Sequence, residues 1–228
     1  GELDEYLDTL LHLEMLRAHD ESGAELSFRH SLIQESAYNT ILLRDRRHFH
    51  RRAAEAIEQH FVDRISEYAG DIAHHYYEAG DARGIEWLMR AAEQAQAVYE
   101  PELVIAFCCK ALALAERLDA PTPAQALLMR GRARDVLGNF DDARADFEAL
   151  VKLARDRGRL DLQWEALLEL GAIWAVKDYD LAGDHVRDAL AVAHLIGDEA
   201  RVAHSLNRIG NWYINVGDPA NPLKAHGQ

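Results

Sequence analysis

Residues 131–147 read GRARDVLGNFDDARADF, and their small and aromatic residues are spaced as in two antiparallel helices joined by a turn. Gly131 is followed at +12 by Ala143 and at +16 by Phe147, with the turn expected at Gly138. A glycine in the middle of a helix costs about 1 kcal/mol relative to alanine. We therefore expect Gly131 to lie where the partner helix approaches closely.

Similar segments recur around Gly171 and Gly210, at intervals of 40 and 39 residues. A fixed period of this size predicts an array of helical repeats, in which each repeat covers the apolar face of its neighbour. The pattern resembles the tetratricopeptide repeat (TPR). Gly210 has only the first half of the pattern, with a turn expected at Gly217, and no second helix fits before Gln228. We therefore expect an array that is interrupted within a repeat.

Upstream of Gly131 the repeat continues in a weaker form. Residues 69–92 predict two helices with a turn at Gly80, and Ala73 takes the position of the small residue. A further helix is expected over residues 99–118, with a proline in its first turn, where proline is tolerated. Residues 65–228 are therefore predicted to form a TPR-like α-α superhelix of about three and a half repeats.

Residues 1–64 follow a different pattern. An amphipathic helix is predicted over residues 3–16, a short strand over residues 26–28, and a second helix capped by Ser31 with Gln34 three positions later. These elements are typical of the C-terminal part of a winged-helix domain. The predicted fold class is all-α, with a winged-helix-like N-terminal segment and a small β-wing before the superhelix.

The stretch FRHSLIQESAY, residues 28–38, resembles the segment that follows the ATPase core in bacterial signalling ATPases of the STAND type. The resemblance continues through LL at 42–43, RR at 46–47, HRR at 50–52, and AHHYYEAGD at 73–81. In these AAA-like proteins a P-loop NTPase and a winged helix precede a TPR array, often fused to a LuxR-type transcriptional regulator or a class III adenylate/guanylate cyclase.

The resemblance implies a region of a signal-transduction ATPase that binds an inducer or a protein partner and couples this event to the NTPase. The alternative is a passive TPR scaffold for protein-protein interaction. The sequence contains no GxxxxGK[ST] phosphate-binding loop, so the chain itself is not expected to be an enzyme. By the same resemblance, ATP, ADP and Mg²⁺ belong to the parent protein, and an NTPase domain is an intramolecular partner.

The resemblance also implies a role for His30. In STAND proteins a histidine at the start of a motif similar to His30-Ser31-Leu32-Ile33 touches bound ADP. An imidazole at a helix N-terminus can donate to phosphate, where the helix dipole also favours an anion. Ser31 stands where the family usually has an acidic residue. The alternative is that the side chain of His30 bonds to a nearby backbone group.

Composition argues against several other classes. The formal net charge of −14 disfavours a general affinity for nucleic acid, and the arginines of residues 44–52 are expected to meet acidic neighbours such as Glu55 and Glu58. No apolar run approaches the ~20 residues of a membrane helix, and the acidic start is unlike a secretory leader. The adjacent cysteines 108 and 109 fit a reducing, cytoplasmic setting.

Two groups of side chains remain as candidates for binding. Tyr76, Trp174 and Tyr213 each lie three residues after a small residue of a repeat, so they are candidates to line a partner or ligand groove, with packing between helices as the alternative. Asp71 and His75 have the i, i+4 spacing of neighbours on one helix face. Because no third ligand is apparent nearby, we expect solvated or packed histidines rather than a metal site.

Overall fold

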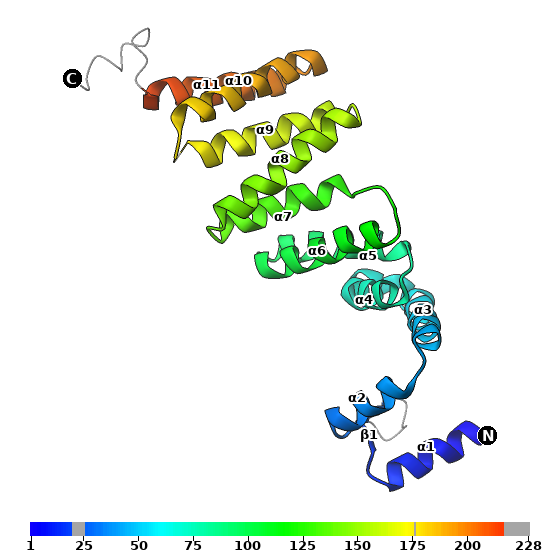
Figure 1. Ribbon diagram of the computed structural model, residues 1–228. Coiled ribbons are helices and arrows are strands. Elements are labelled where there is room, and N and C mark those ends of the chain that lie inside the picture. Colours follow the sequence, from blue (N-terminus) through cyan, green and yellow to red (C-terminus); the bar gives the residue numbers. More distant parts are fainter. Residues whose placement is uncertain (20–25, 176, 217–228) are drawn as a thin grey trace.

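The computed structural model describes residues 1–19, 26–175 and 177–216, and over these residues the fold is all-α apart from one small sheet (Figure 1). The expected turn at Gly217 lies outside the described residues. The helices are α1 (Glu2–His12), α2 (Ser31–Thr40), α3 (Leu43–His60), a 3-10 helix η1 (Val62–Tyr68), α4 (Ala69–Ala79), α5 (Arg83–Ala97), α6 (Pro101–Arg117), α7 (Ala124–Val136), α8 (Phe140–Asp156), α9 (Leu160–Trp174), α10 (Tyr179–Ile196) and α11 (Glu199–Val216).

The sheet consists of two short antiparallel strands, β1 (Leu16–Ala18) and β2 (Leu26–Phe28). Strand β2 confirms the strand predicted for residues 26–28. The prediction that the first helix continues to Leu16 is wrong, because α1 ends at His12. Glu14 has a positive φ of 57°, and its N–H donates to the carbonyl of Leu11 at 3.0 Å, so the helix closes there and the chain turns into β1.

Helix α2 begins as predicted, but its cap differs from the expectation. His30, rather than Ser31, is the N-cap residue, and its extended backbone (φ −133°, ψ 129°) precedes the first helical residue. Ser31 is already inside the helix, where its side chain cannot reach the free N–H groups of the first turn. The prediction of Ser31 as the cap is therefore wrong.

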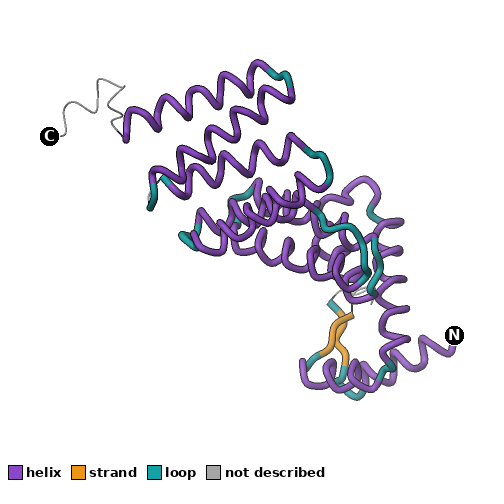
Figure 2. The backbone as a smooth tube through the Cα atoms, turned by 45° about the horizontal axis from the view of Figure 1, so that its top comes forward, coloured by secondary structure: helices purple, strands orange, loops and turns teal. Residues whose placement is uncertain are grey.

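Helices α3 to α11 form a stack in which each helix packs mainly on its neighbours in the chain (Figures 1 and 2). The turns between helices are short, and several contain a glycine with a left-handed backbone. Gly80 has φ 66° and Gly138 has φ 77°, which confirms the two turns predicted at these residues. Such a conformation carries no steric penalty for glycine, so these residues allow the chain to reverse direction within a few residues.

The close approach predicted for the helical glycines is confirmed at two of the three positions. A Cβ on Gly131 would lie 2.5 Å from the ring of Phe147, and a Cβ on Gly171 would lie 2.6 Å from Cγ2 of Val186. Gly210 differs, because a Cβ there would meet no heavy atom of the described residues within 4 Å. The packing reason inferred from the period therefore holds for α7 on α8 and for α9 on α10.

The order of the helices corrects the register predicted upstream. Two steps along the chain separate α7 from α9 and α9 from α11, whereas three steps separate α4 from α7. Every second helix of such a stack takes the same place in the repeat, so α4, three steps from α7, is out of step with α7, α9 and α11. Ala73 on α4 is thus not the counterpart of Gly131. Gly84 lies on α5, two steps from α7, and a Cβ there would lie 2.8 Å from Cδ2 of Leu114.

The buried side chains form a continuous set of clusters along the stack. One cluster joins α3 to α6, a second joins α5 to α7, and a third joins α7 to α10. The predicted boundary between residues 64 and 65 falls beside the first cluster, because Ala54 of α3 is fully buried in it together with residues of α4. By its packing, α3 therefore belongs with the stack. The large side chains buried in the clusters include Ile72, Tyr76, Leu88, Leu114, Phe147, Leu150, Leu167 and Leu170.

Candidate functional site

The cavity beside Trp174 lies where the end of α7, the start of α8 and the end of α9 meet. Its volume is about 540 Å³. The side chain of Trp174 is half-buried, and Phe140 is 52% exposed, so aromatic surface is open to solvent here. The residues that line this cavity, here named the Trp174 pocket, are Asp135, Phe140, Asp141, Arg144, Ala172, Ile173, Trp174 and Lys177.

Charged groups surround the aromatic surface of the Trp174 pocket. The guanidinium of Arg144 lies 5.2 Å from the centre of the Trp174 ring, and it pairs with Asp141 at 3.3 Å and Glu148 at 3.6 Å. Burial, together with the charge of Glu169, raises the pKa of the Asp135 carboxyl. An aromatic ring with a cation above it and carboxylates beside it can hold a ligand that has both apolar and charged parts.

A second concavity crosses three helices of the same direction, α7, α9 and α11. At its centre Arg132 of α7 pairs with two residues of α9, Glu165 at 3.1 Å and Glu169 at 2.6 Å. Its volume is about 360 Å³, and it is lined by Arg132, Trp164, Glu165, Leu168, Glu169, His204 and Arg208. Arg132 also lines an adjoining, mostly apolar cavity of about 210 Å³ between α5, α6 and α7. We name the two together the Arg132 groove.

The three predicted groove aromatics are not brought together. Tyr76 is fully buried, and its hydroxyl donates to Oε2 of Glu58 at 2.6 Å. The prediction that Tyr76 lines a groove is therefore wrong, because α3 covers this face of α4. Trp87 Nε1 donates to the other oxygen of Glu58 at 2.8 Å, so one carboxylate of α3 binds residues of both α4 and α5.

Trp174 and Tyr213 lie in different surroundings. Trp174 lines the pocket named after it, in agreement with its predicted exposure to a ligand. Tyr213 is half-buried on α11, and its ring meets the neighbouring Trp212 edge to face with the ring centres 4.8 Å apart. Trp212 is the residue that packs on α10, since its indole occupies the space beside Gly183 and its Nε1 donates to the carbonyl of Tyr179 at 2.5 Å.

His30 is an exposed residue at the N-terminus of α2. Its side chain makes no capping hydrogen bond within the described residues, while its carbonyl accepts from the N–H groups of Ile33 and Gln34 at 3.1 and 3.3 Å. An exposed imidazole at this position is accessible to another domain. Its role in ADP sensing concerns such a domain and stays a prediction.

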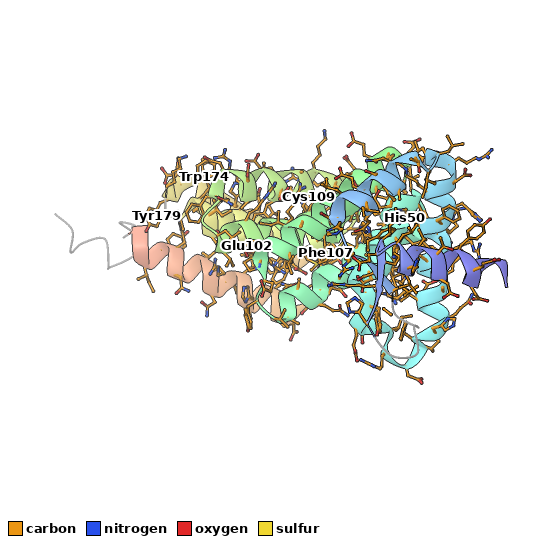
Figure 3. The ribbon with its side chains drawn as sticks, turned by 90° about the horizontal axis from the view of Figure 1, so that it is seen from below. His50, Glu102, Phe107, Cys109, Trp174 and Tyr179 are labelled. Atoms are coloured by element: carbon orange, nitrogen blue, oxygen red, sulfur yellow. The ribbon has the colours of Figure 1, made fainter. Side chains whose placement is uncertain are left out.

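Figure 3 shows His50 far along the stack from Trp174, and His50 meets two adjacent histidines of the next helix there. His50 of α3 and His74 and His75 of α4 each place a ring nitrogen within 4.8 Å of those of the other two. Nδ1 of His50 and Nδ1 of His75 are 2.9 Å apart and share a hydrogen bond. We name these residues the histidine cluster. The sequence prediction missed it because His50 comes close to His75 only when α3 packs on α4.

The environment of the histidine cluster favours uncharged rings. Burial lowers the pKa of His50, and the neighbouring His74 lowers it further. Burial also lowers the pKa of His75, with His50 and His74 acting in the same direction and the charges of Asp71 and Glu78 opposing them. Neutral imidazoles retain a lone pair, which is the form that can ligate a metal ion.

The arginines of α3 meet partners that differ in part from those expected. Arg51 pairs with Asp81 at 2.9 Å, across from α3 to the turn before α5. Arg46 instead donates to the carbonyls of Ile41 and Asn39, at the end of α2. Acidic partners are thus confirmed for Arg51, but Glu58 binds Tyr76 and Trp87 rather than an arginine.

Comparison with known proteins adds no assignment to this geometry. No protein-family model matches the chain, and no curated protein matches it. Within the part of the chain that the structure describes, none of the helices has the length and apolar character needed to cross a lipid bilayer. The functional conclusions below therefore depend on the residues and on their arrangement.

Proposed function

We propose that this chain is the non-catalytic sensor and protein-interaction region of a multidomain signal-transduction ATPase, acting in the cytoplasm. Residues 1–64 would form the C-terminal part of its winged helix, and residues 65–228 a TPR-like array. The support is the resemblance of residues 28–81 to STAND-type ATPases, together with the helical period whose packing is seen at Gly131 and Gly171. A large stack of antiparallel helices with short turns is also the architecture on which repeat proteins build binding surfaces.

The observation that carries the proposal is the Trp174 pocket. Its volume of about 540 Å³ falls in the usual range of ligand sites, about 300–1,000 Å³. It combines an accessible indole, the phenyl ring of Phe140 and charges of both signs. Such a site suits an inducer, or an inserted side chain of a protein partner, that carries an apolar group and a charge. A ligand that binds one packing of the array better than another shifts the population toward that packing, which is how the signal would reach the NTPase.

The second candidate function is a passive scaffold, and the Arg132 groove favours it. This groove runs across α7, α9 and α11, and a segment of a partner protein could lie along it in an extended form. Arg132 is already paired with Glu165 and Glu169 in the absence of a partner, so its geometry is held before binding. A groove with a preset geometry can bind without any switch.

The two functions can be separated in the full-length gene product. We would measure retention of ADP and the basal rate of ATP turnover for the native protein and for two variants, His30→Ala and Trp174→Ala. The matched control is Leu195→Ala, since Leu195 is 73% exposed and lies outside both the Trp174 pocket and the Arg132 groove.

A sensor function predicts that His30→Ala loses ADP and raises basal turnover, and that Trp174→Ala changes the response to the inducer, whereas Leu195→Ala leaves both unchanged. If the gene product binds no nucleotide, the assignment to a signalling ATPase is wrong. The passive scaffold is the better description if all four proteins retain the same amount of nucleotide and if the affinity for the partner is the same with and without nucleotide.

A further inference from the structure

The histidine cluster brings together three ligands of the same chemical type from two helices. His50 projects from α3, and His74 and His75 project from α4, with one nitrogen of each within 4.8 Å of the others. The ring centres of the three pairs are 5.2 to 5.7 Å apart. Adjacent histidines on a helix do not share a face, yet the rings of His74 and His75 are 5.3 Å apart, and His50 of the neighbouring helix comes within 5.7 and 5.2 Å of them.

The geometry needs little change to accommodate an ion. Two nitrogens bound to one tetrahedral Zn²⁺ lie about 3.3 Å apart, since each Zn–N bond is about 2.0–2.1 Å long. The Nδ1 atoms of His50 and His75 are 2.9 Å apart, so these rings must separate by only a few tenths of an ångström. His74 is exposed and can rotate to complete the set, which leaves a fourth position open to water.

The other nitrogen of His50 already has the partner that a metal-bound histidine requires. Its Nε2 lies 3.0 Å from the hydroxyl of Tyr38, on α2. A ligating imidazole usually donates its second N–H to an oxygen, which fixes the ring and leaves the first nitrogen for the metal. Tyr38 is itself held in place, because the guanidinium of Arg46 lies 4.5 Å from the centre of its ring.

The charges and the protonation state around the cluster also favour a cation. The negative charges of Asp71 and Glu78 act on His75, and burial lowers the pKa of both His50 and His75. Three imidazole ligands suit borderline divalent ions such as Zn²⁺, Ni²⁺ and Cu²⁺, and they suit Mg²⁺ and Ca²⁺ poorly.

We propose that His50, His74 and His75 bind one divalent transition-metal ion, with Zn²⁺ as the reference ion and Tyr38 as the residue that orients His50. The ion would join α3 to α4 directly and would join α2 to both through Tyr38. It would thus fasten the N-terminal segment to the helical stack. This site does not depend on the proposed signalling function, because its residues and its test lie within the chain itself.

The test is a competition titration of the 228-residue chain, without a polyhistidine tag, against a chromophoric Zn²⁺ indicator. We expect one Zn²⁺ per chain at this site. His74→Gln and His75→Gln should each weaken binding at least about tenfold, and Tyr38→Phe should weaken it by about tenfold through the loss of orientation. The matched control is His48→Gln, because His48 is an exposed residue of α3, the helix of His50, and lies outside the cluster.

A second readout separates ligation from folding. His74 is exposed, so His74→Gln should unfold at the same temperature as the native chain when no metal is present. At a free Zn²⁺ concentration near the dissociation constant of the native chain, Zn²⁺ should raise the unfolding temperature of the native chain and of His48→Gln clearly more than that of His74→Gln. The proposal is overturned if the native chain takes up no Zn²⁺ at one equivalent, or if His48→Gln and His74→Gln bind Zn²⁺ equally well.

Discussion

Gly131 of α7 lies so close to Phe147 of α8 that the buried phenyl ring occupies the space that a Cβ would need. The separation from a Cβ at residue 131 to the ring would be 2.5 Å, far inside van der Waals contact. Phe147 is only 1% exposed, so its ring has no open space into which to move. The glycine is therefore required by the contact between the two helices.

This contact predicts opposite effects for the same substitution at two helical glycines. Gly131→Ala should lower the free energy of unfolding by about 1–2 kcal/mol, because overpacking against Phe147 exceeds the gain of about 1 kcal/mol in helix propensity. Gly210→Ala should be neutral or stabilising by up to about 1 kcal/mol, because among the residues that the structure describes a Cβ there meets nothing within 4 Å. Urea denaturation followed by circular dichroism would measure both. Equal effects would contradict the packing explanation.

Asp146 is a buried carboxylate held by two arginines of the preceding helix. It is 3% exposed and pairs with Arg130 at 2.6 Å and with Arg134 at 2.7 Å. We expect Asp146→Asn to lower the free energy of unfolding by about 2–4 kcal/mol, because both guanidinium groups then lose their counter-charge in a largely buried position. The control Asp141→Asn removes a carboxylate that is 79% exposed and should change stability by no more than about 0.5 kcal/mol. If both variants lose a similar amount of unfolding free energy, the burial of Asp146 is not the reason for its effect.

The Asp81 carboxylate should make part of the stability depend on pH in acid. Hydrogen bonds from Arg83 lower its pKa to about 2, below the ordinary value of 3.8. A carboxyl whose pKa is lower in the folded state adds stability above its unfolded pKa, and that stability is lost as the pH falls toward about 2. We expect Asp81→Asn to cost about 1–2 kcal/mol at neutral pH, since both arginine partners are nearly half exposed, and to cost nothing near pH 2.

Denaturation of the native chain and Asp81→Asn at a series of pH values would measure this difference. Glu86→Gln is a suitable control, because Glu86 is 69% exposed and its pair with Arg90 lies on the surface. The difference in unfolding free energy between the native chain and Glu86→Gln should stay small and should not change with pH. If the stability difference between the native chain and Asp81→Asn stays the same down to pH 2, the Asp81 carboxylate is not the source of the pH dependence.

The buried position of Tyr76 leads to a fourth prediction. Tyr76→Phe removes the hydrogen bond to Glu58 and leaves that half-buried carboxylate with Trp87 as its remaining partner. We expect a loss of about 1–2 kcal/mol in the free energy of unfolding and no change in ligand binding at the Trp174 pocket. Tyr99→Phe should have no effect on stability, because Tyr99 is 91% exposed. A change in ligand binding without a change in stability would restore the groove interpretation of Tyr76.

Much of the helical architecture can be inferred from local residue patterns. The turns at Gly80 and Gly138 and the strand β2 occur where the sequence predicts them, and the helix predicted over residues 99–118 is found at Pro101–Arg117. Each depends on interactions within a few residues: a left-handed glycine, alternating side chains, or a proline at a helix start. The close contacts at Gly131 and Gly171 were also predictable, because a glycine inside a helix needs a packing reason.

The candidate sites could be predicted only in part, because they depend on which helices become neighbours. Trp174 was identified correctly as accessible. Tyr76, by contrast, lies on α4, which is three helices before α7 and out of step with it, and α3 covers its side chain. The partners of Trp174 in its pocket, Phe140 and Arg144, could not be inferred from periodicity, since they come from the preceding helix, α8. His50 likewise had no signal in its own segment that would link it to His75.

The amino-acid order thus determines where the helices of this protein begin and end and where the chain reverses, because capping groups, glycine backbones and i, i+4 contacts act over one or two turns. Only the packed structure brings Glu58 to Tyr76, Trp212 to Gly183 and His50 to His75. These contacts join side chains 18 to 29 residues apart, and they depend on the angle and register with which one helix lies on the next. Interhelical packing, which local sequence patterns do not specify, therefore creates the sites at which this protein can bind.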